Sequence, residues 1–120
     1  MSKSARSVFI FGLYLGVLGI VLLVTPNFLL GIFQLPNTNE VWIRVVGMLL
    51  LFMGFYYTQA ARKEMTDFFN WTVYARPTVI LFFTAFVLLD FASPLLILFG
   101  VVDLLGAIWT GMALRSTKTV

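Results

Sequence analysis

The sequence predicts an all-α integral membrane protein, a bundle of four transmembrane helices. Of the 120 residues, 61% are hydrophobic and only 11% are charged, whereas about a quarter of a soluble domain is charged. The mean hydropathy is +1.01, and the apolar residues form long runs, most of them near the ~20 residues that cross the hydrocarbon core of a bilayer. Short polar or proline-containing segments separate these runs. We expect a single domain that covers residues 1–120.

The first half of the chain contains two predicted spans, at about 8–25 and 41–61. The first follows Lys3 and Arg6, as the apolar core of a signal peptide would. However, Pro26 stands where the small residues of a cleavage site would be needed. We therefore expect this segment to remain as a transmembrane helix. Pro26 also predicts its end, because the residue before a proline disfavours helical geometry.

The second half contains a charged segment, 61–77, and two further predicted spans, 77–91 and 94–114. Within the charged segment, apolar residues repeat at helical spacing, which predicts a short amphipathic helix lying on the cytoplasmic membrane surface. Ser93 and Pro94 form an N-cap followed by a proline in the first helical position, which is a typical helix start. The last two spans should therefore form a tight hairpin.

The distribution of basic residues predicts the orientation of the helices. They fall at the N-terminus, between the second and third spans, and at the C-terminus: Lys3, Arg6, Arg62, Lys63, Arg76, Arg115 and Lys118. Cytoplasmic loops carry the excess of Lys and Arg. The sequence thus predicts an N-in/C-in protein whose middle segment is also cytoplasmic.

Three ionisable residues lie in or beside the predicted spans, namely Arg44, Asp90 and Asp103. Asp103 follows Pro94 by enough residues to lie ~13 Å deep at ~1.5 Å per residue. A charge at the centre of a bilayer costs roughly 2.5–3.5 kcal/mol on insertion scales. Because side chains lean toward the N-terminus of their helix, Arg44 is expected to pair with Asp90 more readily than with Asp103. Asp103 would then be protonated or hydrogen-bonded to a neighbouring helix.

These polar residues have three interpretations, which the sequence leaves open. They hold the helices together, they form a site for a proton, ion or polar ligand, or they contact a partner subunit.

Glycines recur on the predicted helices at spacings that suit close packing. Gly12 and Gly16 form a GxxxG pattern, and small residues allow helices to approach closely in lipid. The predicted packing residues are Gly12, Gly16, Gly19, Gly47, Gly54, Gly100 and Gly106. We expect them to serve packing within the chain more than a homodimer contact.

Several chemistries are unsupported by the residues present. The chain has neither cysteine nor histidine, so Ser-His and Cys-His arrangements and the commonest metal ligands are missing. No cofactor or metal site is predicted, and no catalytic residues are predicted. We therefore expect the protein not to be an enzyme. The net charge of +3 is too small to indicate nucleic acid binding.

Two segments, "GLYLGVLGIVLLVTPNFLL" (12–30) and "LFGVVDLLGAIWTGMALR" (98–115), give the chain its general pattern. This pattern resembles small uncharacterised bacterial inner-membrane proteins of the DoxX-like type. The resemblance implies a four-helix bundle in a bacterial cytoplasmic (inner) membrane, and it implies no particular activity.

The functional expectation is a non-enzymatic membrane protein, an accessory, assembly or interaction subunit. Its partners would be the lipid bilayer and other membrane proteins or further copies of the same chain. The alternative is a small transporter or lipophilic-ligand-binding protein that uses the intramembrane residues Asp103 and Arg44.

Overall fold

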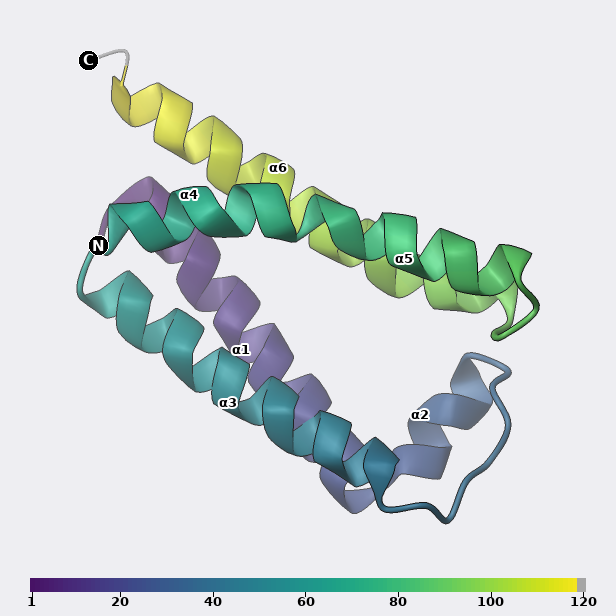
Figure 1. Cartoon of the computed structure of the whole chain (residues 1–120). Coiled ribbons are helices and arrows are strands. Elements are labelled where there is room, and N and C mark those ends of the chain that lie inside the picture. The colour runs from purple at the N-terminus through teal and green to yellow at the C-terminus, as the bar shows by residue number, and fades with distance from the viewer. Residues whose placement is uncertain (119–120) are drawn as a thin grey trace.

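The computed structural model describes residues 1–118, which form helices joined by turns and one longer loop at 33–41, with no strand among them (Figure 1). The order is α1 (Lys3–Val24), α2 (Pro26–Ile32), α3 (Trp42–Arg62), α4 (Thr66–Ala75), α5 (Pro77–Leu88), a 3₁₀ turn (Pro94–Leu96) and α6 (Ile97–Lys118). Four helical segments are long and apolar enough to cross a membrane: Lys3–Val24, Trp42–Arg62, Thr66–Leu88 and Pro94–Ser116. The predicted all-α class and the four membrane-length segments are confirmed.

The third of these segments differs from the expectation. Helices α4 and α5 follow one another almost in line (Figure 1), so the candidate span Thr66–Leu88 includes most of the segment predicted to lie separately on the membrane surface. Pro77 does not break this rod. Arg76 before it stays helical, at φ −61° and ψ −39°, and its backbone N–H donates to Thr72 O at 3.0 Å. Proline at the first position of α5 lacks only an N–H that this position can spare.

Glycines bring α1 and α3 into backbone contact along most of their length. A Cβ atom added to Gly54 would lie 2.6 Å from the carbonyl oxygen of Gly12, and one added to Gly19 would lie 2.6 Å from that of Gly47. No side chain fits at such distances. The α1–α3 seam therefore depends on these glycines, because small residues allow two helices to approach closely in lipid.

Helices α5 and α6 form the second pair, and α6 also contacts α1. A Cβ atom added to Gly100 would lie 2.7 Å from Cα of Ile80, so a glycine again sets the approach of two helices. The α1–α3 pair and the α5–α6 pair lie together near the chain termini and diverge toward the other end (Figure 1). The shared core lies at the close end and consists of Ala5, Val8, Phe11, Leu15, Tyr57, Ala60, Ala61, Phe69 and Leu114.

Candidate functional site

Two cavities lie between the helix pairs. The larger chamber, about 430 Å³, lies between α1, α3, α5 and α6, and its lining includes Phe11, Tyr57, Arg76 and Asp103. The smaller chamber, about 260 Å³, extends toward α2 and is lined mostly by leucines and phenylalanines. Both chambers share the same four lining residues, Leu15, Leu50, Phe83 and Asp103. The two chambers are therefore adjacent, and Asp103 lies at their junction.

Arg76 is only 3% exposed, although it carries a full charge. Its Nε donates to Thr72 O at 3.3 Å, and its Nη2 donates to Thr72 Oγ1 at 3.1 Å and to Thr110 Oγ1 at 2.8 Å. The guanidinium carbon lies 4.7 Å from the centre of the Phe11 ring, in a cation–π contact. Nη1 is buried and has no hydrogen-bond partner. Arg76 is thus fixed in position with one donor group unused.

Gly106 provides the space for this guanidinium. A Cβ atom at Gly106 would lie 3.1 Å from Nη1 of Arg76 and 3.0 Å from Cδ2 of Phe11. Those distances are shorter than ordinary van der Waals contact, so a side chain here would have to displace the arginine or the ring. Gly106 is therefore a positioning residue for Arg76 as well as a packing residue.

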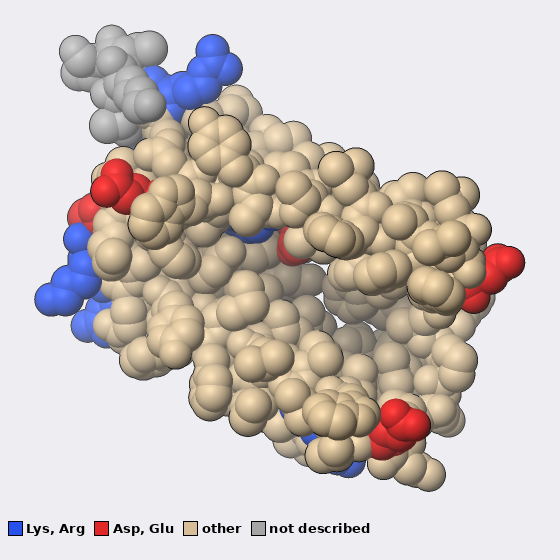
Figure 2. Space-filling view, viewed as in Figure 1, with Lys and Arg blue, Asp and Glu red and all other residues tan. Residues whose placement is uncertain are grey.

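Asp103 is the acidic residue of the chambers. Its side chain is partly buried, and its carboxylate has no hydrogen-bond or ion-pair partner among residues 1–116, whose side chains the structure describes; the separation from Arg76 exceeds the 4.0 Å of a salt bridge. Within the hollow between the helix pairs, Figure 2 shows acidic and basic atoms close together in otherwise uncharged surroundings. Among the described lining residues of the two chambers, Arg76 and Asp103 are the charged ones.

A short polar network supports Arg76 from the side of the chain termini. Thr110 Oγ1, which accepts from Arg76, lies 2.7 Å from Ser7 Oγ, and Ser7 Oγ donates to the carbonyl oxygen of Ser4 at 2.7 Å. Ser7 and Thr110 are at most 1% exposed. The network joins α1, α6 and the α4–α5 rod, and it holds the charged end of Arg76 at the chamber wall.

The N-terminus is attached to the α3–α4 turn at the same end of the molecule. The backbone N–H and the hydroxyl of Ser2 donate to the two carboxylate oxygens of Glu64, at 2.6 and 2.7 Å. These hydrogen bonds lower the pKa of Glu64 below its ordinary value. Glu64 is exposed and lies outside the four membrane-length segments.

The structure does not bring the three predicted polar residues together. Arg44 donates through Nη1 to the carbonyl oxygen of Leu23 near the end of α1, and Asp90 is exposed in the turn after α5 at a φ of 63°. The described residues contain no ion pair between Arg44 and Asp90, so the prediction of that pair was wrong. An unpaired carbonyl at a helix end attracts a cation, and Leu23 supplied that partner instead. Of the three, Asp103 alone lines a chamber.

Sequence reasoning missed Arg76. It was counted with the basic residues between the second and third predicted spans, because the third span was expected to begin at about Pro77. A signal was nevertheless present: Gly106 and Thr110 share with Asp103 one face of the fourth predicted span. A polar face on a membrane helix requires a polar partner on a neighbouring helix.

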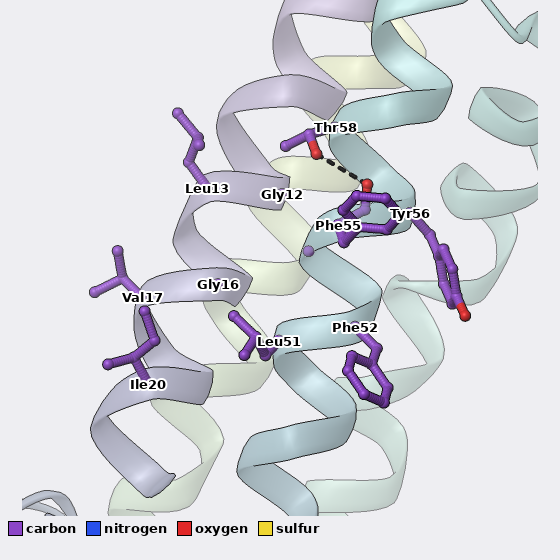
Figure 3. A pocket seen from close by; sticks show the side chains of 11 residues that line it. Gly12, Leu13, Gly16, Val17, Ile20, Leu51, Phe52, Phe55, Tyr56 and Thr58 are labelled. Atoms are coloured by element: carbon purple, nitrogen blue, oxygen red, sulfur yellow. Dashed lines mark hydrogen bonds between the residues drawn. The ribbon is translucent and has the colours of Figure 1, made fainter. Parts of the chain in front are cut away.

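Six of the seven predicted packing glycines lie where an added Cβ atom would meet another helix, and Gly16 is the exception because nothing lies within 4 Å of its Cβ position. Gly16 instead forms part of the floor of an outer groove of about 680 Å³ between α1 and α3. Figure 3 shows Leu13, Val17 and Ile20 extending from α1 and Phe52 from α3 around this groove. It contains no charged residue.

Comparison with known proteins identifies no relative. No family model, curated protein or solved structure matches the chain.

Proposed function

We propose that this chain is a membrane-embedded binding protein for a lipophilic small molecule, which occupies the two adjacent chambers. The observation that supports it is the placement of Arg76 and Asp103. Both lie on the wall of one chamber, they do not pair with each other, and the guanidinium has a buried donor group without an acceptor. Unpaired charges are costly in a bilayer, and a ligand with a polar group would reduce that cost.

The size and lining of the chambers agree with such a ligand. Small-molecule sites are usually clefts of about 300–1,000 Å³ with apolar walls and a few polar groups that fix orientation. The larger chamber alone, at about 430 Å³, falls within this range. Exposed Met53, Phe82 and Phe86 line its rim on α3 and α5, so a ligand would enter from the bilayer between these two helices.

The sequence suggested, as its alternative function, a ligand-binding protein whose site contains Asp103 and Arg44. The proposed site also contains Asp103, but its basic residue is Arg76 instead of Arg44. The orientation remains the one that the basic residues predict: the end that carries Ser2 and Glu64 would face the cytoplasm of a bacterium.

Native mass spectrometry tests the proposal on protein released from membranes with little delipidation. The wild-type chain should carry a stoichiometric additional mass. Leu50→Trp should remove it, because Leu50 lines both chambers and an indole would fill their junction. Leu49→Trp is the matched control, since Leu49 is 52% exposed and lines neither. A bare wild-type protomer, or equal loading of the two variants, would contradict the proposal.

A second candidate is the accessory or assembly subunit, and the outer groove favours it. Gly12, Gly16 and Gly54 form a floor that a helix of another membrane protein could approach closely. Gly16→Leu would fill this groove without meeting any neighbouring atom near the Cβ position. If a partner occupies the groove, the substitution should abolish its co-purification and leave the thermal stability of the isolated chain unchanged.

A further inference from the structure

We infer that the ligand is a single-chain amphiphile whose head is uncharged and carries a hydrogen-bond acceptor beside a donor, as in a primary long-chain amide. This inference rests on the proposed function and concerns the head group that the chambers select. Its structural basis is the arrangement of Arg76 and Asp103 on one chamber wall without mutual contact.

The hydrogen-bonding inventory of the two residues defines the head. A guanidinium has only donors, and an ionised carboxylate has only acceptors. Arg76 has already used Nε and Nη2, and Nη1 has no partner. Asp103 has no hydrogen-bond partner among the described residues. A ligand that bridges them must therefore present a donor to Asp103 and an acceptor to Arg76, whose guanidinium has to turn toward the chamber because Nη1 is itself enclosed.

The charge balance excludes a charged head. With Asp103 ionised, Arg76 and Asp103 together carry no net charge, and an additional anion or cation would leave an uncompensated charge in an apolar region. A neutral amide satisfies both residues and leaves the balance unchanged. An ester or a tertiary amide has an acceptor alone, so it would leave the carboxylate without a partner.

The smaller chamber determines where the chain lies. It begins at Asp103, Leu15 and Leu50 and continues between Leu22 and Leu30 toward Phe33 and Phe99. The Phe33 and Phe99 rings stack with their centres 4.1 Å apart and line its far part. Its volume, about 260 Å³, is smaller than the 430 Å³ of the larger chamber. We expect it to take a single hydrocarbon chain, with the head group beside Asp103 at the junction of the two chambers.

Palmitamide and N,N-dimethylpalmitamide test the inference, because they share a chain and a carbonyl acceptor and differ in the N–H donors. Binding is measured by native mass spectrometry of the full chain in nanodiscs. The wild type should bind palmitamide at least about tenfold more tightly, as expected for one hydrogen bond to a charged group. Asp103→Leu should remove this preference, and Asp103→Asn should retain part of it because an amide oxygen still accepts.

A second measurement remains informative if Asp103→Leu fails to fold. Palmitamide labelled isotopically at its carbonyl should show an infrared band shifted to lower frequency on binding, since Arg76 donates to that oxygen. The shift should be absent for palmitamide bound to Arg76→Met.

The outcomes separate this inference from the proposed function. If the wild type binds both amides equally, and Leu50→Trp prevents binding of both, the chambers bind lipophilic molecules and the head-group inference is overturned. If Leu50→Trp and Leu49→Trp bind the amides equally well, the chambers are not the site and both proposals fail. An unshifted carbonyl band with palmitamide bound would overturn the assignment of Arg76 as the donor.

Discussion

The two sides of α3 are packed in opposite ways. On one side α3 lies against α1, and backbone atoms of the facing helix lie 2.6–2.7 Å from the positions that Cβ atoms would occupy on Gly19, Gly47 and Gly54. On the other side α3 faces α5 and α6 across the larger chamber, where its residues are the bulky Leu50, Met53 and Tyr57.

The difference shows what residue size does in a helical membrane protein. Small residues let two helices approach until the backbones touch, so the seam depends on shape alone. Large residues hold the helices apart, and the space between them contains a fixed cation and an unpartnered acid. A rigid seam on one side of α3 thus supports an open, polar-lined space on the other.

The largest expected effect on stability is on the side of α3 that packs against α1. Gly54→Ala should lower the free energy of unfolding by about 3 kcal/mol, the upper end of overpacking costs, because the new Cβ would meet the backbone of Gly12 and Gly16. Gly16→Ala is the control on the same seam. Its Cβ meets nothing within 4 Å, so its stability should stay unchanged or rise by up to about 1 kcal/mol from helix propensity. Unfolding in mixed micelles measures the stability of both variants. Equal losses of unfolding free energy would show that backbone contact does not limit how closely α1 and α3 approach.

The next effect concerns the network that holds Arg76. Thr110→Val removes an acceptor from a buried guanidinium and should cost about 2 kcal/mol, as for hydrogen bonds to charged groups. Ser7→Ala leaves that acceptor in place. It should cost about 0.6 kcal/mol, the average for hydrogen bonds between membrane helices. Unfolding titrations of both variants check this ranking. A larger loss of unfolding free energy for Ser7→Ala would show that the hydrogen bond to α1 contributes more to stability than the hydrogen bond to Arg76.

At the chamber, on α6, Gly106→Ala should affect ligand binding more than folding. The new Cβ would displace the end of the Arg76 side chain or the Phe11 ring, and both can shift. We expect palmitamide affinity to fall about tenfold, which corresponds to about 1.4 kcal/mol, with little change in thermal stability. Gly111→Ala is matched to it on the same helix, since its nearest neighbour would be at 3.6 Å, and its affinity should equal that of the wild type. Equal affinities for the two variants would refute the positioning role of Gly106.

The smallest effect is at the exposed Ser2–Glu64 contact. Because the hydrogen bonds from Ser2 lower the pKa of Glu64, folding favours the ionised carboxylate. This stabilisation is present above the pKa of an unfolded glutamate, about 4.3, and is lost as the pH falls through the lower folded pKa. The thermal stability of the wild type should therefore exceed that of Glu64→Gln slightly at neutral pH, and the difference should disappear in acid. Melting curves from neutral to acidic pH measure it, and a constant difference would show that the carboxylate charge is irrelevant.

The sequence predicted well which segments form helices. It predicted poorly which residues of different helices contact each other. Hydropathy located the membrane-length helices, because burial of apolar residues in lipid is a property of each segment by itself, but Pro77 misplaced the start of the third, which begins at Thr66. The glycine positions were also readable, since a residue without a side chain permits close approach wherever its helix packs. The candidate site was predictable only through Asp103, which is conspicuous in an apolar run.

Amino-acid order by itself determined the all-α class, the membrane-length segments and the presence of an acid within the last of them. Tertiary structure alone decided which cation shares its chamber. Arg76 and Asp103 lie on different helices, and their proximity depends on α4 and α5 continuing in line through Pro77 and on Gly106 leaving room for the guanidinium. Arg44, which the sequence-based alternative placed in one site with Asp103, donates to Leu23 instead. Partner choice depends on helix rotation and separation, which packing sets and local sequence does not encode.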